Sequence, residues 1–375
     1  MANNNENKIL NVPHLRFPEF SGEWKKCIIQ DYGEVVTGNT PPTNNAEYYN
    51  NGSYLWASPA DLGINKNVTD TKTKLSLSGF KKTRNVPKGS VLVTCIGSTI
   101  GKMGMATETM SSNQQINSVV VNDKNNSDFV YYAICRAFPR YLSEVGVQAV
   151  PILSKSNFEK LPNYTTSRDE QNKIGYFLSL LDERIATQIK IIDKLQSLIK
   201  GLAVALTTKG KPNIAISQCL ECHSSTLQES EVLPNGLYKV FGANGLVGYT
   251  DVPQMSSDAI LVIKDGSGVG TVSYAQGKFS VIGTLNYLTA IGNIDLRYLY
   301  FALSVFNFQP YKTGMAIPHI YFKDYGKAKI YCPPLAEQKH VANVLGKLES
   351  KLFVEQRLLA SFNQQKQYLL GQMFI

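Results

Sequence analysis

The chain has 375 residues, a mass of 41.5 kDa, and 38 Lys and Arg against 29 Asp and Glu, which gives a formal net charge of +9. A content of 43% apolar residues excludes a disordered chain, the length suits two domains, and no apolar run approaches the roughly 18 residues that a membrane-spanning helix needs. Six Cys exclude a disulfide scaffold and the polar start at Met1–Lys8 lacks a signal-peptide pattern, so we expect a cytoplasmic protein with reduced thiols.

The first half of the chain predicts an arm followed by a mixed α and β segment. We expect the arm over Met1–Ser21. Val86–Gly97 predicts a turn, a short buried strand and a glycine turn, and Asn117–Asn122 predicts a further strand. A short helix rich in aromatic residues is expected over Phe129–Tyr141. These elements together are typical of a compact mixed domain.

A long amphipathic helix is predicted next. Ser167–Glu170 has the pattern of a capping box that opens it. Positions 174, 178, 181, 185, 188, 192, 195, 199 and 202 follow a 4,3 spacing, and eight of these nine are apolar. This spacing is that of a coiled-coil seam, and Thr207–Asn213 is expected to be a linker after it.

The second half repeats the plan. Ala259–Gly266 predicts a buried strand and a glycine turn. Val281–Ala290 predicts a further strand, and Leu296–Phe306 predicts a short helix. Pro333-Pro334 ends the last strand before a second long helix. The seam positions of this second helix lie 167 residues after those of the first helix, and seven of the nine are apolar.

An internal duplication accounts for this parallel. Glu170-Gln171 returns as Glu337-Gln338 at an offset of 167, and Gly97–Gly101 resembles Gly266–Gly270 at an offset of 169. Two interpretations of the helices stay open: two ordinary amphipathic helices, each packed on its own domain, or helices that pair with each other or with partner helices. If the helices pair, Gln188 and Glu355 are the polar residues at the middle of each seam. The predicted interface consists of Ile174, Leu178, Leu181, Ile185, Gln188, Ile192, Leu195, Val341, Leu345, Leu348, Leu352, Glu355 and Leu359.

The usual catalytic motifs do not occur in the sequence. No Gly-Lys pair precedes Ser or Thr as a Walker A motif requires, and the glycines at 266–270 lack dinucleotide-site spacing. Neither Thr40–Thr43 nor Cys332–Leu335 has the Asn or Asp, Pro-Pro, aromatic pattern of an amino-group DNA methyltransferase. Cys219–His223 offers too few ligands for zinc. We therefore predict no catalytic residues and no metal on this chain.

Scattered basic and amide side chains instead permit nucleic-acid binding. Lys and Arg along a groove neutralise phosphates, and Asn, Gln, Arg and Lys can read base edges. The alternative is a solvated surface with a mild basic excess. The candidate DNA contacts are Lys81, Lys82, Arg84, Ser98, Thr99, Lys102, Gln114, Gln115, Lys155, Lys264, Ser267, Lys278, Lys312 and His319.

The sequence resembles the specificity subunits of type I restriction-modification enzymes. The resemblance covers nearly the whole chain and is carried by Pro13–Phe20 with Trp24, Gly97–Gly101, Asn113–Asn117, Glu170–Ile174 with Leu178 and Leu181-Asp182, and Pro334–Gln338. His340 departs from the family pattern, in which Lys or Arg is commoner. The family's contact residues lie in variable domains, so none is transferred from it.

The resemblance implies a mixed α/β fold with duplicated target-recognition domains, joined by two long antiparallel coiled-coil helices. It implies an arm and first recognition domain at 1–166, a first spacer helix at 167–206, a second recognition domain at 207–333 and a second spacer helix at 334–375. Each domain would read one half of a split, asymmetric site in double-stranded DNA.

The resemblance also implies partners. Two methyltransferase subunits and restriction (translocase) subunits would dock on this chain and carry S-adenosylmethionine, ATP and Mg²⁺, while this chain carries no cofactor. Two other functions stay open: a DNA-modifying enzyme with an unrecognised active site, and a coiled-coil scaffold without a DNA role.

Overall fold

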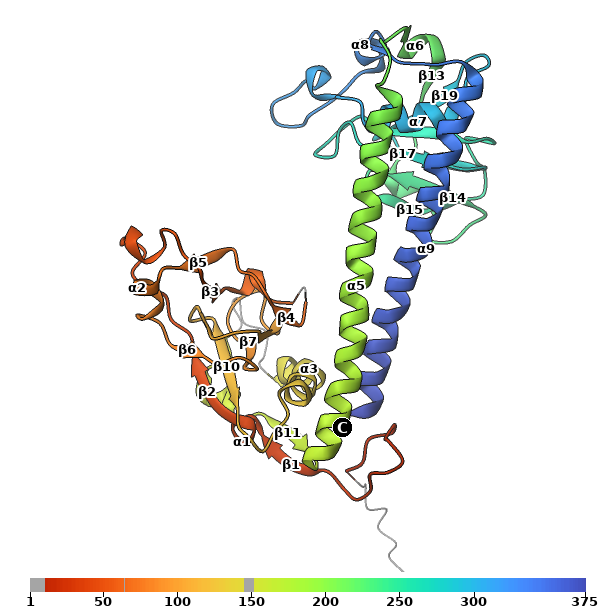
Figure 1. Cartoon of the computed structure of the whole chain (residues 1–375). Helices are drawn as coiled ribbons and strands as arrows, with labels where there is room; N and C mark the ends of the chain where they lie inside the picture. Colours follow the sequence, from red (N-terminus) through yellow and green to blue (C-terminus); the bar gives the residue numbers. More distant parts are fainter. Residues whose placement is uncertain (1–10, 64, 145–151) are drawn as a thin grey trace, which may run out of the picture. The chain divides into compact units, whose positions relative to one another are not determined.

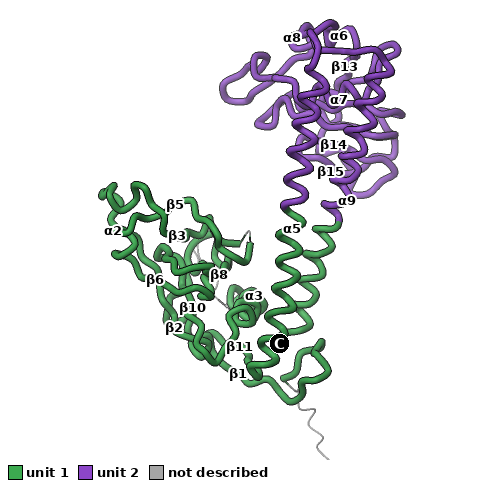
Figure 2. The backbone as a smooth tube through the Cα atoms, viewed as in Figure 1, with its two compact units in different colours: residues 1–189, 358–375 green, residues 190–357 purple. Residues whose placement is uncertain are grey.

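The computed structural model describes residues 11–63, 65–144 and 152–375. The chain divides into two compact units, one formed by residues 1–189 with 358–375 and the other by residues 190–357 (Figure 2). Each unit combines a mixed α/β segment with parts of two long helices, α5 (Arg168–Thr207) and α9 (Leu335–Met373) (Figure 1). Residues 1–10 of the expected arm lie outside the described residues.

The first unit contains two main sheets. The larger has the order β2-β10-β7-β8-β4, and β7 is buried along its whole length because its Val-Leu-Val-Thr sequence is covered on both faces. The second has the order β5-β3-β9-β6, and a two-stranded sheet joins β1 to β11. The strands are β1 (Lys25–Ile28), β2 (Gly33–Thr37), β3 (Tyr54–Ala57), β4 (Asn67–Val68), β5 (Thr73–Leu75), β6 (Asn85–Val86), β7 (Val91–Thr94), β8 (Met103–Ala106), β9 (Met110–Ser112), β10 (Ile116–Val121) and β11 (Pro162–Thr165).

Short helices complete the mixed segment of the first unit. The longest, α3, is rich in aromatic residues as predicted and begins two residues earlier than expected. The α-helices are α1 (Ile29–Tyr32), α2 (Leu77–Phe80), α3 (Ser127–Glu144) and α4 (Lys155–Glu159), with 3-10 turns η1 (Ala46–Tyr48) and η2 (Pro59–Asp61).

The second unit repeats this organisation with fewer strands. The hairpin β16-β17 and its neighbour β19 pair as β7, β8 and β10 do, in the sheet order β13-β19-β16-β17. The strands are β12 (Ile214–Ala215), β13 (Leu220–Ser224), β14 (Tyr238–Gly242), β15 (Gly245–Thr250), β16 (Ala259–Ile263), β17 (Val272–Ala275), β18 (Phe279–Val281), β19 (Leu285–Ala290) and β20 (Lys329–Ile330). The helices are η3 (Glu229–Glu231), α6 (Ile216–Cys219), α7 (Leu296–Ser304), η4 (Gln309–Tyr311) and α8 (Phe322–Tyr325).

Each unit has its own core, and in each the long helices contribute to it. In the first unit the start of α5, with Ile174 and Leu178, shares a core with Leu369 and Met373 near the end of α9. In the second unit Ala203, near the end of α5, shares a core with Val341 and Leu345 near the start of α9. The two helices therefore run in opposite directions within each unit. The mixed α/β fold class predicted from the sequence is confirmed.

The start of α5 differs in one detail from the capping box predicted from the sequence. Ser167 does cap the helix, because its hydroxyl accepts a hydrogen bond from the Glu170 N–H at 3.4 Å. The Glu170 carboxylate does not complete a capping box, since its two oxygens bond to Arg16 and Thr166 instead.

None of the helices that the structure describes combines the length and apolar character needed to cross a bilayer.

Candidate nucleic-acid interface

A glycine turn closes the same hairpin in both units. Gly97 and Gly101 have φ of 96° and 90°, and Gly266 and Gly270 have 96° and 87°, a region that side chains disfavour. The Gly101 N–H donates to the Thr94 carbonyl at 2.9 Å, and the equivalent Gly270 N–H donates to the Ile263 carbonyl at 2.9 Å. The turns are structural, and each leaves a hydroxyl residue, Ser98 or Ser267, exposed at its tip.

In the first unit, several predicted contact residues converge around the segment that follows β2. The Asn39 side chain accepts from the Arg84 N–H at 2.8 Å and donates to the Lys82 carbonyl at 2.9 Å. The next residue, Thr40, donates its hydroxyl to Gln114 Oε1 at 2.6 Å. Lys82, Arg84 and Gln114 are all exposed, so side chains with the chemistry to bind phosphate lie beside an amide with the chemistry to read a base edge.

Asn39 and Thr40 were missed by sequence reasoning. They organise the cluster without being basic, and their partners lie 43 to 74 positions away, so no local pattern marks them. The only sequence signal is the turn-forming Gly38-Asn39-Thr40-Pro41. We name Asn39, Thr40, Lys82, Arg84 and Gln114 the first polar cluster.

Gln115, one of the predicted DNA contacts, makes hydrogen bonds that give it a structural role. Its Oε1 accepts from Asn113 Nδ2 at 3.0 Å, and its Nε2 donates to the Ile96 carbonyl at 3.4 Å. The amide thus ties the glycine turn to the strand that precedes β10. Because both ends of the amide are engaged, Gln115 positions the turn that carries Ser98 and Thr99.

The remaining predicted contacts of the first unit are scattered. Lys155 is on α4, where Glu159 one turn later neutralises it at 3.5 Å. Lys102 is half-buried directly after the glycine turn, and Lys81 is exposed at the end of α2. Lys155 should therefore attract a phosphate group less strongly than Lys81 or Lys82.

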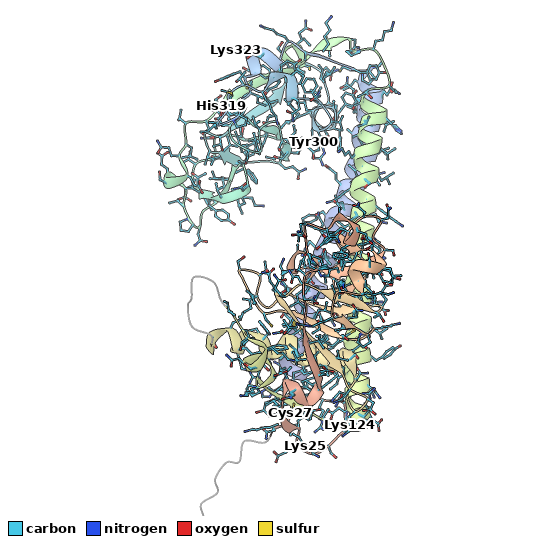
Figure 3. All side chains as sticks on the ribbon, turned by 90° about the vertical axis from the view of Figure 1, so that its left-hand side faces the viewer. Lys25, Cys27, Lys124, Tyr300, His319 and Lys323 are labelled. Carbon is cyan, nitrogen blue, oxygen red and sulfur yellow. The ribbon has the colours of Figure 1, made fainter. Side chains whose placement is uncertain are left out.

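In the second unit, His319 is held at the corresponding turn (Figure 3). His319 Nδ1 lies 2.7 Å from Asp265 Oδ1, and the two residues also form a backbone bridge. The first unit has the same bridge between Ile96 and Ile152. The same pair of bridged positions therefore holds two apolar side chains in the first unit and two polar side chains in the second.

Other predicted residues lie at the same end of the β16-β17 hairpin. Lys264 directly follows β16, and its carbonyl accepts from the Ile320 N–H at 2.9 Å, next to His319. Lys312 directly precedes Thr313, which pairs with His319 through backbone hydrogen bonds of 2.9 and 2.7 Å. The structure thus brings Lys264, Ser267, Lys312 and His319 together as the second polar cluster.

Lys278 does not belong to this cluster. The register of the hairpin pairs Ala259 with Ala275, so Lys278 follows the opposite end of β17 from the glycine turn. Its Nζ lies 5.8 Å from the centre of the Tyr238 ring. The sequence placed it with the others only because it is basic.

The thiols have the chemistry of buried structural groups. Burial raises the pKa of Cys95 and of Cys219 to about 12, and that of Cys222 to about 11. Thiols with such pKa values are poor nucleophiles and poor metal ligands at neutral pH. Within the described ranges, no group of three or more His, Cys, Asp or Glu side chains is arranged to hold a metal ion.

An apolar groove lies between the two long helices in the first unit. It has a volume of about 700 Å³ and is lined by Phe177, Leu180 and Leu181 of α5 and by Leu358 and Phe362 of α9. Phe177, Leu180 and Leu358 are 39%, 41% and 40% exposed. Such an apolar strip on paired helices is typical of a protein–protein contact.

The predicted seam positions are buried or half-buried along both helices, and Gln188, at 5% exposed, is among the most buried polar residues of α5. Glu355 is half-buried. The proposed pairing of these two midpoints stays a prediction.

Comparison with known proteins finds a family match in each half of the chain. The family model described as "Type I restriction modification DNA specificity domain" matches residues 21–197 and again 220–364. The chain is 28% identical over 151 residues to the type I restriction enzyme HindI specificity subunit of Haemophilus influenzae, an alignment that covers 39% of this chain and 32% of that protein. It is 29% identical over 188 residues to the MjaIX specificity subunit of Methanocaldococcus jannaschii, covering 46% and 42%. These alignments thus span less than half of each relative.

A solved structure shares the fold along nearly the whole chain. The crystal structure of a type I restriction-modification S subunit from M. genitalium superposes with a TM-score of 0.69 at 19% identity, over 97% of this chain and 99% of that one.

Proposed function

Because the chain belongs to the family of type I restriction modification DNA specificity domains, we propose that it is the DNA-recognition subunit of a type I restriction-modification complex. The observation that carries the proposal is that the family model matches twice, at 21–197 and 220–364. Each match contains one glycine-turn hairpin with its polar cluster. One chain thus presents two DNA readers of common design.

The two readers recognise different half-sites. The first polar cluster presents Lys82, Arg84 and Gln114, whereas the second presents Lys264, Lys312 and the His319–Asp265 pair. Base edges are distinguished by the donors and acceptors that face them, so readers with different side chains select different bases. The recognised site is therefore split and asymmetric.

The two long helices act as an antiparallel coiled-coil spacer between the readers. The opposite directions of α5 and α9 within each unit and the burial of the 4,3-spaced positions support this role. The apolar groove in the first unit supports docking of a methyltransferase subunit on the helices, with Phe177 and Leu180 as contacts.

Catalysis resides on the partners. Two methyltransferase subunits bind S-adenosylmethionine and transfer the methyl group to adenine, and restriction subunits use ATP and Mg²⁺. The absence of methyltransferase and Walker A motifs from this sequence supports the division of labour.

The proposal is tested by expressing the chain with its methyltransferase subunit and sequencing the methylated positions in cellular DNA. We expect one split motif. Exchange of residues 35–163 for the equivalent segment of a relative should change one half of that motif and leave the other. Methyl transfer by the purified chain without partners, or a change in both halves, would contradict the proposal.

A further inference from the structure

A buried glutamine attaches the recognition domain to a long helix in both units. Gln171 is 2% exposed, its Oε1 accepts from the Asn126 N–H at 2.9 Å, and its Nε2 donates to the Thr166 carbonyl at 2.9 Å. Gln338 is 4% exposed and makes the same two bonds, from the Asp295 N–H at 2.9 Å and to the Pro333 carbonyl at 2.7 Å. One amide thus joins the start of the domain helix, α3 or α7, to the start of the long helix.

A tyrosine provides a second attachment farther along each long helix. The Tyr132 hydroxyl of α3 donates to Asp182 Oδ2 of α5 at 2.6 Å. The Tyr300 hydroxyl of α7, labelled in Figure 3, donates to Glu349 Oε1 of α9 at 2.7 Å. Asp182 follows Gln171, and Glu349 follows Gln338, by the same 11 positions. This spacing is about three helical turns, or roughly 16 Å along one face.

Cations hold each acceptor carboxylate in place. In the first unit Lys366 of α9 donates to Asp182 Oδ1 at 2.5 Å, and Lys66 donates to the Tyr132 hydroxyl at 3.3 Å and to Asp128 at 2.6 Å. The tyrosine oxygen accepts from one side and donates to the other, so its orientation is fixed.

The second unit uses an arginine for the same purpose. Arg297 pairs with the other oxygen of Glu349 and lies 4.3 Å from the centre of the Tyr274 ring. Burial, followed by the neighbouring carboxylate, raises the pKa of Tyr132 and of Tyr300 well above the ordinary value. Both hydroxyls therefore keep their proton and donate at every working pH.

We propose that Tyr132–Asp182 and Tyr300–Glu349 are positioning pairs that set the angle of each recognition domain on its helices, and thereby the gap length accepted between the half-sites. Apolar packing also holds each domain on its helices, but it is not directional, whereas two hydrogen-bonded attachments roughly 16 Å apart fix a direction. The glutamine is the first attachment and the tyrosine the second. This inference rests on the proposed function.

The test compares tyrosines whose hydroxyls donate to side chains of the long helices with tyrosines whose hydroxyls donate to backbone carbonyls. Tyr132→Phe and Tyr300→Phe remove one hydroxyl each. Tyr141→Phe and Tyr298→Phe are matched controls, because these buried tyrosines of α3 and α7 donate to carbonyls of their own domains, at Pro162 and Tyr331. Each variant is assembled with its methyltransferase subunits. The probes are duplexes that carry the motif methylated in cellular DNA, with its gap unchanged, one base pair shorter or one longer.

We expect the ratio of methylation rates on the unchanged gap and on the altered gaps to fall about tenfold in Tyr132→Phe and Tyr300→Phe. Tenfold corresponds to about 1.4 kcal/mol, the scale of one hydrogen bond to a charged group. The controls should keep the wild-type ratio even where the absolute rate drops.

Two results would overturn the inference. One is an unchanged ratio in both tyrosine variants, and the other is an equal loss of the ratio in the controls, which would indicate general loosening. A wild-type complex that methylates no split motif would instead overturn the proposed function, and this inference with it.

Discussion

Arg16 forms a two-point ion pair with Glu170, with its Nε 2.7 Å from Oε1 and its Nη2 2.8 Å from Oε2. The carboxylate is 1% exposed and the arginine 12% exposed. The pair joins the segment before β1 to the first turn of α5, 154 positions later. The acidic residue of the repeated Glu-Gln sequence thus has a partner within its own unit.

Removal of Arg16 should destabilise the first unit strongly. Arg16→Ala leaves the buried Glu170 charge with Thr166 alone, and an uncompensated buried charge costs about 3–5 kcal/mol. Both tryptophans, Trp24 and Trp56, are in the first unit, so tryptophan fluorescence during urea unfolding reports its free energy of unfolding. Lys74→Ala is the control: its pair with Asp70 is exposed to solvent, so its loss should leave the free energy of unfolding nearly unchanged. Equal effects of the two variants would contradict this prediction.

Lys82→Ala should weaken DNA binding by the assembled complex in a salt-dependent way. Loss of one phosphate contact reduces the slope of log affinity against log salt by about 1. Fluorescence anisotropy with a duplex carrying the methylated motif, across a salt series, measures the slope. Lys155→Ala is the matched control, because Glu159 already neutralises that lysine. A slope that Lys82→Ala leaves at the wild-type value would remove the first polar cluster from the DNA interface.

Leu180→Asp should impair assembly with the methyltransferase subunit. The change places a charge in the apolar groove, where a docked partner would exclude water. We expect at least a tenfold loss of affinity, about 1.4 kcal/mol, in a titration of the purified subunits. Leu77→Asp, at a 51% exposed position on α2, should leave affinity unchanged. Undiminished assembly of Leu180→Asp would place the partner elsewhere.

The cysteines should resist thiol reagents while the chain is folded. Burial raises the pKa of Cys27 and Cys135 to about 11 and that of Cys95 to about 12, against about 8.5 for an unfolded cysteine. The thiolate is the reactive form, so labelling at pH 8 should be at least about 100-fold slower than in urea. Rapid labelling of most thiols without loss of structure would contradict this.

The same shifts have a consequence for stability. Because the unfolded chain loses its thiol protons first, the contribution of these cysteines is complete below about pH 8.5 and falls as pH rises towards 11. A urea series between pH 7.5 and roughly 10.5 measures the decline.

The sequence predicted elements better than it predicted the contacts between them. The buried run Val91–Thr94 and the 4,3 spacing from Ile174 onward are local patterns, and each produced the expected element. The pairing of Arg16 with Glu170, by contrast, joins positions that no periodicity connects. The predicted capping box was half wrong for that reason, since a distant arginine takes the glutamate that the local pattern assigns to the helix start.

The candidate interface shows the same limit. Residue type alone selected Lys82, Lys155 and Lys278, which the structure separates into a clustered lysine, a neutralised lysine and one at the other end of a hairpin. Asn39 organises the first polar cluster through its side-chain amide, a role that depends on the partners brought to it by folding.

The packing of the first unit also has a consequence for how the chain folds during synthesis. The Leu15 N–H donates to the Gln372 carbonyl at 2.8 Å, and the Phe374 ring lies 5.8 Å from Trp24 and 5.3 Å from Phe129. The core around Trp24 is therefore incomplete until residues 369–374 have left the ribosome. Residues 190–357 are continuous and emerge before that point. The segment translated later can thus finish folding first, which reverses the usual order of co-translational folding. The apolar side chains of α3, although made earlier, need protection until residues 369–374 have left the ribosome.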